Sequence, residues 1–155
     1  MAIRVLKEVS REGGRLPATG ASVIAGIPLE LASATTVRPY QGGANTLPLG
    51  LASDSNILQP LQGPNGLTVG VGYDYTNFNR GGLIGAFLNG GVYELWNDGT
   101  GYPFDQVSYA LNEAVYANSS TGKVNSAAGA NGKLVGVCMG IVGSPVTRLT
   151  LKLLI

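Results

Sequence analysis

A short pattern of apolar and polar segments occurs twice in this chain, and it restricts the folds that the chain can adopt. Each copy begins with a short alternating segment, passes through a small polar turn to a Thr-Val or Lys-Val step, and ends on an apolar segment divided by a glycine. Gly136 follows Gly50 by 86 residues and Val124 follows Val37 by 87, so a single one-residue slip aligns the copies. We therefore predict two related β units. They cover residues 27–55 and 114–142, with the sequences IPLELASATTVRPYQGGANTLPLGLASDS and AVYANSSTGKVNSAAGANGKLVGVCMGIV.

The composition favours short strands joined by tight turns. The 155 residues include 24 Gly and 8 Pro, and 45% of them are hydrophobic. Gly and Pro form turns, whereas β-branched and aromatic residues fit strands. A chain of this length buries roughly 70% of its unfolded surface, so its core needs neither disulfides nor a metal. We predict an all-β fold, a small sandwich or barrel of about nine to eleven short strands without a long helix.

Only 12% of the residues are charged, and the formal net charge is +1. A small soluble monomer usually carries more charge than this. Two interpretations remain open: the surface is simply uncharged, or it lies against other protein subunits.

Residues 1–15 differ from the rest of the chain, because they hold four of its ten basic residues. The pattern fits either a short amphipathic helix or an extended segment that pairs with a sheet edge. Neither is stable alone, since ordering the backbone costs roughly 1–2 kcal/mol per residue. We predict an N-terminal arm, residues 1–15, ordered by its own domain or by a neighbour, and a single β domain, residues 16–155. The arm residues expected to contact a neighbour are Ile3, Arg4, Val5, Leu6, Lys7, Val9 and Arg11.

A hairpin region, residues 67–105, is predicted to be inserted between the two β units. Alternation over residues 67–75 indicates a strand. Two apolar runs flank Asn89-Gly90, a dipeptide favoured in two-residue turns, so residues 83–96 are predicted to form a β-hairpin. Residues 107–117 favour a strand, with a helical turn near residues 108–111 as the alternative. The alternating residues 146–155 predict a half-buried terminal strand.

Groups for catalysis are sparse in this sequence. Histidine is absent, which removes the commonest general base, and the nine Asp and Glu residues are scattered as single residues. We interpret each acid outside the arm, Glu30 included, as a solvated turn or strand-face residue, and we predict no enzyme activity, metal or cofactor. Cys138 lies in an apolar run and is expected to be a buried thiol. The aromatic residues expected to be exposed for contacts are Trp96, Tyr93 and Tyr102.

The sequence also bears on membranes and nucleic acids as partners. No apolar run approaches the ~20 residues that cross a membrane, and no strongly basic face is evident. We expect neither a membrane nor a nucleic acid as a direct partner.

The repeated unit resembles the capsid decoration proteins of tailed bacteriophages, also called cement or head-stabilising proteins. The matching pieces are Ser120-Thr121-Gly122-Lys123-Val124 followed by residues 134–137, and Thr36-Val37 followed by residues 47–52. The basic N-terminal arm and the glycine-rich, histidine-free composition are similar too. The inserted region between the two units matches no part of the family's pattern.

The resemblance implies a β-rich structural protein that binds the outer surface of the mature capsid and stabilises it by bridging neighbouring capsomers. It implies the major capsid protein as partner, a homotrimer as the assembled state, synthesis in the host cytoplasm and a final place in the virion. Two alternatives stay open: another virion component, such as a tail, fibre or capsid subunit, and a carbohydrate-binding β-sandwich that uses Trp96 and the tyrosines.

Overall fold

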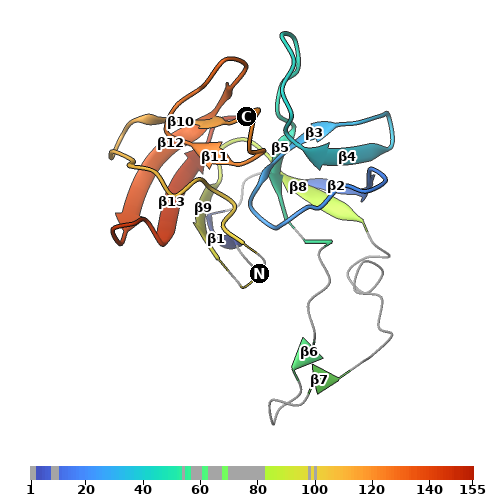
Figure 1. Ribbon diagram of the computed structural model, residues 1–155, viewed down its shortest axis with the longest axis horizontal. Helices are drawn as coiled ribbons and strands as arrows, with labels where there is room; N and C mark the ends of the chain where they lie inside the picture. The colour runs from blue at the N-terminus through green and yellow to red at the C-terminus, as the bar shows by residue number, and fades with distance from the viewer. Residues whose placement is uncertain are drawn as a thin grey trace.

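The computed structural model describes residues 3–7, 11–53, 55–56, 61–62, 68–69, 83–97, 99 and 101–155. Every regular element among these residues is a β-strand, which confirms the all-β prediction. The strands form a closed five-stranded barrel, a six-stranded sheet and a separate two-stranded ladder. Figure 1 shows the barrel in blue and green beside the sheet, most of which is coloured yellow to red.

The barrel has the strand order β2-β4-β3-β5-β8 and closes on itself. The pairing of β2 with β4 is parallel, and the other ladders are antiparallel. Its interior is filled by one apolar cluster that includes Val23, Ile27, Leu29 and Ile84. The strands are β2 (Arg11–Pro17), β3 (Pro28–Leu31), β4 (Thr36–Pro39), β5 (Gly50–Ala52) and β8 (Ile84–Phe87).

The six-stranded sheet has the order β1-β9-β13-β12-β10-β11, and all of its ladders are antiparallel. An isolated parallel bridge joins Phe104 to Val124 on β11. Inward-facing residues of β13 alternate with exposed ones, as predicted for residues 146–155. The strands are β1 (Ile3–Lys7), β9 (Val92–Trp96), β10 (Ala114–Ala117), β11 (Val124–Asn125), β12 (Lys133–Val142) and β13 (Arg148–Leu153).

The two β units of the sequence have the same strand order and the same register. In each unit the first strand lies between the second and the third, as β4-β3-β5 and as β11-β10-β12. Leu29 lies opposite Gly50, and Val115 lies opposite Gly136, so both pairs are shifted by 86 residues. Leu31 pairs with Val37 as Ala117 pairs with Val124, with the same one-residue slip as in the sequence.

The correspondence extends beyond the two sequence segments. Strands β2 and β8 of the barrel occupy the places of β9 and β13 in the sheet, and the Pro17–Val37 pair matches the Phe104–Val124 bridge. Backbone hydrogen bonds outside the strands repeat with lengths that agree within 0.1 Å. Gly26 N donates to Ala52 O at 2.8 Å, as Asn112 N donates to Cys138 O at 2.9 Å. Ile27 N donates to Ile24 O, as Glu113 N donates to Ala110 O, both at 3.3 Å. Ala18 N donates to Val37 O, as Asp105 N donates to Val124 O, both at 2.8 Å.

Asn112 is the non-glycine residue with positive φ among the described residues, at 65°. Its counterpart in the first unit is Gly26, with φ 92°. Only Gly, and less often Asn or Asp, adopts this left-handed conformation readily. The repeated backbone path therefore explains an otherwise unusual asparagine conformation.

The prediction of a β-hairpin over residues 83–96 is wrong. Asn89-Gly90 does form a turn, with φ 90° at Gly90, and strands β8 and β9 flank it. However, β8 pairs with β2 and β5, whereas β9 pairs with β1 and β13. The turn thus joins the two units, because each strand completes the sheet of its own unit instead of pairing with the other.

The remaining strand predictions have mixed outcomes. In residues 107–117, strand β10 begins only at Ala114, after a turn at residues 111–112. Of the strand predicted over residues 67–75, the structure describes only β7 (Thr68–Val69), which pairs with β6 (Leu61–Gln62); the rest lies outside the described residues. Figure 1 shows the β6–β7 ladder standing apart from the barrel and the sheet.

Tyr40 connects the first unit to the core of the second. Its side chain is fully buried and belongs to the apolar cluster that fills the second unit. Its hydroxyl lies 2.8 Å from the carbonyl oxygen of Asn131 and 3.2 Å from that of Thr46, so it can donate to either. The loops at residues 40–46 and 118–132 therefore lie in contact.

Replacing Gly50 or Gly136 by alanine is predicted to destabilise the protein by about 2–3 kcal/mol each, because overpacking a closed backbone contact costs this much. A Cβ atom at Gly50 would overlap the carbonyl oxygen of Phe87, and one at Gly136 would overlap that of Lys152. Chemical unfolding of the two variants measures the loss. Gly140→Ala is the matched control, since its Cβ would meet Thr150 at 3.3 Å and should cost much less. Equal losses at all three positions would contradict this explanation.

Candidate interaction surface

Strand β1 lies at one edge of the six-stranded sheet and is anchored there by Ile3. Ile3 pairs with Leu95 of β9 and is 1% exposed within the core. Of the two structures considered for this segment, the extended one is therefore present. Arg4 is exposed, Val5 is 38% exposed and Leu6 is 49% exposed. The register shifts between Val5 and Lys7, which makes Leu6 the irregular position of the strand.

The outer edge of β1 is the feature of this surface with the clearest capacity to bind. β9 pairs with one side of β1, and no strand of the described residues pairs with the other side. An edge strand presents a row of backbone N–H and C=O groups, onto which an extended segment of another chain can add. Exposed Val5 and Leu6 side chains lie along the same strand.

Strands β1 and β2, which are neighbours in the chain, belong to different units. Strand β1 belongs to the six-stranded sheet, whereas β2 belongs to the barrel. The boundary proposed between Arg15 and Leu16 falls inside β2, so removing residues 1–15 would take away most of a barrel strand. Val9 and the side chains of Lys7 and Arg11 lie outside the described residues, so their predicted contacts stay predictions.

The three aromatic residues predicted to be exposed have different environments. Tyr93 is fully buried, with its ring centroid 4.8 Å from that of Phe87, so its predicted exposure is wrong. Its side chain points inward because it occupies the buried phase of the alternating strand β9. Trp96 and Tyr102 are half-buried, and Tyr102 packs edge-on against Phe104 at 5.3 Å.

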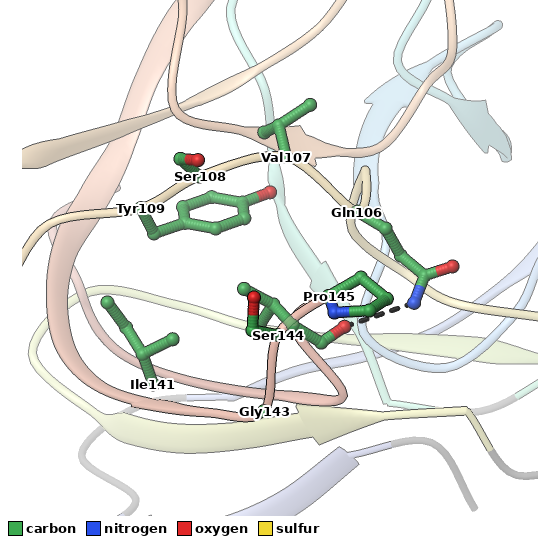
Figure 2. Close-up of a pocket in the computed structure, with 9 residues that line it drawn as sticks. Gln106, Val107, Ser108, Tyr109, Ile141, Gly143, Ser144 and Pro145 are labelled. Carbon is green, nitrogen blue, oxygen red and sulfur yellow. Dashed lines mark hydrogen bonds between the residues drawn. The ribbon is translucent and has the colours of Figure 1, made fainter.

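An open pocket lies between residues 106–109 and the turn that joins β12 to β13 (Figure 2). Its volume is about 470 Å³. The side-chain amide of Gln106 donates to the carbonyl oxygen of Val146 at 3.1 Å and links the two walls. The remaining lining residues are Val107, Ser108, Tyr109, Ile141, Gly143, Ser144 and Pro145, none of which is charged. This pocket could not be predicted from the sequence, because its two walls are about 35 residues apart in the chain.

Tyr109 lines this pocket as a neutral hydrogen-bond donor. Its hydroxyl lies 2.7 Å from the carbonyl oxygen of Asp105 and 3.0 Å from that of Val124. Burial, and next the Asp105 carboxylate, raise the pKa of Tyr109 well above its usual range. Tyr109 is therefore protonated near neutral pH and does not act there as a base.

Other groups that could carry chemistry are isolated from one another. Within the described ranges, no three Cys, Asp or Glu side chains lie close enough to hold a metal ion. The Cys138 thiol is buried, as predicted, and burial raises its pKa. In the part of the chain that the structure describes, no helix is long and apolar enough to span a membrane.

Glu30 contradicts the interpretation of the acids as solvated residues, because it is only 2% exposed. Its carboxylate accepts a hydrogen bond from Arg38 Nε at 2.8 Å and others from the backbone N–H groups of Gln41 and Gly42 at 3.2 Å. A buried carboxylate needs such partners. Glu30 and Arg38 lie directly opposite each other on β3 and β4, a pairing that becomes visible only once the two strands are aligned.

No protein-family profile matches this chain, and no curated protein is significantly similar to it. The family resemblance of the repeated unit is thus carried by the residues quoted for it and by nothing else.

Replacing Ile3 by alanine is predicted to destabilise the protein by about 2–4 kcal/mol, the usual cost of removing a buried Ile side chain. Replacing Leu6 by alanine in the same strand should change stability by less than about 0.5 kcal/mol, because Leu6 is half exposed. Urea unfolding of both variants compares the two costs. A loss at Ile3 no larger than that at Leu6 would show that β1 is not anchored as described.

Proposed function

We propose that this protein is a structural component of a tailed bacteriophage that binds the outer surface of the mature capsid. In this role it assembles as a homotrimer and binds the major capsid protein. By bridging neighbouring capsomers it stabilises the capsid. The observation that carries the proposal is the open edge of β1, beside exposed Val5 and Leu6.

An open strand edge suits a protein that must grip a large, repetitive surface. Main-chain hydrogen bonds along an added strand supply affinity, and the exposed side chains beside them supply selectivity. Arg4 adds a positive charge to this edge. Because Ile3 holds β1 in its own sheet, the edge is already ordered before a partner arrives, which lowers the entropic cost of binding.

The composition of the rest of the surface also supports a protein that contacts other subunits. Only 12% of the residues are charged. Among the described residues, eleven large apolar side chains are exposed. Single exposed apolar residues are common, but this number together with the low charge favours a surface that contacts other subunits. The eleven residues are Val5, Leu6, Leu16, Leu31, Leu47, Val107, Leu111, Leu134, Met139, Val142 and Leu154.

Stabilisation of the capsid would follow from mass action. A protein that binds the mature shell and not its immature or opened form lowers the free energy of the mature form alone. At a free concentration 100 times the dissociation constant, each occupied site contributes about 2.7 kcal/mol. Summed over the many equivalent sites of an icosahedral shell, this resists the pressure of packaged DNA.

Cosedimentation with emptied phage heads tests the proposal. The purified protein should sediment with expanded heads and stay in the supernatant with unexpanded precursors. The double variant Arg4→Glu, Leu6→Asp should bind expanded heads at least 10-fold more weakly. It reverses the charge at position 4 and places a carboxylate where Leu6 offers an apolar contact at the β1 edge.

Thr35→Asp is the control, because Thr35 is exposed in the loop between β3 and β4 and is not one of the eleven exposed apolar residues. It should bind as the natural protein does, and circular dichroism should show all variants folded. Binding to neither form of the head would overturn the proposed function. Binding that the β1 variant leaves unchanged would overturn the role of the edge.

A further inference from the structure

Arg38 is held in one orientation with most of its hydrogen-bond donors unused. Its Nε atom donates to the buried carboxylate of Glu30 at 2.8 Å, and its side chain is 40% exposed. A guanidinium carries five N–H donors in a planar fork. Among the described residues, the structure shows no acceptor for the two terminal nitrogens of Arg38. The ion pair with Glu30 thus fixes the guanidinium and leaves its outward N–H donors available.

These donors belong to the wall of a pocket of about 360 Å³ on the first unit. Of the described residues that line it, only Arg38 is charged. The hydroxyls of Thr19 and Ser22 and the amide of Gln41 add neutral donors. The lining residues are Ala18, Thr19, Gly20, Ala21, Ser22, Arg38, Pro39 and Gln41. A pocket with one fixed guanidinium, several neutral donors and no acid is complementary to an anionic group.

In the second unit, side chains of the chain itself occupy the place that corresponds to the Arg38 pocket. Asp105 is the counterpart of Ala18, since the N–H of each donates to the matching Val37 or Val124 carbonyl oxygen at 2.8 Å. Asn125 is the counterpart of Arg38: Asn125 pairs with Tyr116 on the first strand of its unit, and Arg38 pairs with Glu30 at the same register position of the other unit.

In that second unit a carboxylate contacts the residue that replaces Arg38. The Asn125 side-chain amide donates to Asp105 Oδ2 at 2.7 Å, and the Thr121 hydroxyl donates to the same oxygen at 2.8 Å. The first unit has Ala18 in place of the acid and the longer, charged Arg38 in place of the amide. The first unit therefore keeps a donor at this position, and besides Glu30, which binds Nε of Arg38, it has no carboxylate at the position of Asp105.

We propose that the Arg38 pocket binds a carboxylate supplied from outside the chain, which accepts hydrogen bonds from the terminal nitrogens of Arg38. A carboxylate matches the guanidinium fork with two parallel hydrogen bonds. The carboxylate comes either from an Asp or Glu side chain of a partner protein or from a free carboxylic acid. The site does not rest on the proposed capsid function, and its test needs no capsid.

Nuclear magnetic resonance titrations of the full chain distinguish these sources. Acetate represents a free acid, the blocked peptide acetyl-Gly-Asp-Gly-amide represents a protein side chain, and inorganic phosphate is the competing anion. Acetate and the peptide should cause saturable shifts at the Arg38 Nε–H signal and at the amides of residues 18–22 and 41. At least 10-fold tighter binding of the peptide assigns the site to a protein partner, whereas equal binding assigns it to free acids. No saturable shift, or tighter binding of phosphate, overturns the proposal.

Variants at position 18 test the geometry independently of any ligand. Ala18→Asp places a carboxylate where the second unit has Asp105, so it should raise the melting temperature above that of Ala18→Asn, its neutral match in size. It should also weaken acetate binding at least 10-fold. In an Arg38→Gln background the difference between Asp and Asn at position 18 should disappear. An equal difference in both backgrounds would show that Arg38 does not face this position and would overturn the proposal.

Discussion

Each β unit depends on one glycine at which the backbones of two strands approach each other closely. At Gly50 and again at Gly136, the third strand of a unit comes so near the next strand that a Cβ atom would overlap a carbonyl oxygen. Each glycine also lies opposite the central residue of its unit, Leu29 or Val115, both of which are buried. These two contacts require glycine where the third strand of each unit packs against the next strand. The repeated hydrogen bonds on either side, which agree within 0.1 Å, follow from the same backbone path.

The sequence allowed much of this architecture to be predicted, because its pattern of apolar residues and glycines determines strands locally. The first and last strands of each unit, and the register slip between the copies, could be read directly from residues 27–55 and 114–142. Strand partners could not, since a local turn such as Asn89-Gly90 does not say which sheet each flanking strand will join. The buried Glu30 was missed because its partners, Arg38 and two backbone N–H groups, come together only when β3 pairs with β4. Tyr93 was misassigned because its burial depends on the phase of β9 against β13.

The repeated backbone stabilises both units, whereas the proposed binding sites lie where the two units differ. Both units use the same backbone, yet they differ at the positions where side chains reach solvent. In the second unit the Asn125 amide donates to the Asp105 carboxylate, whereas the first unit presents the terminal nitrogens of Arg38 beside a pocket. The second unit also accepts β1 at its edge, which brings an exposed strand to the surface. A protein with few charges and two such sites is suited to binding other proteins, and the proposed place on a capsid follows from that character together with the family resemblance of the repeated unit.

Amide hydrogen exchange in free and head-bound protein would test the central claim, that the β1 edge docks onto the capsid, most directly. Exchange reports the hydrogen bonding of each backbone amide, so a strand added to the open edge must slow exchange in residues 3–7. We expect slower exchange in β1 on expanded heads, with unchanged exchange in β12 and β13, whose amides are already paired inside the sheet. Unchanged exchange in β1 of protein that is bound to the heads would contradict it.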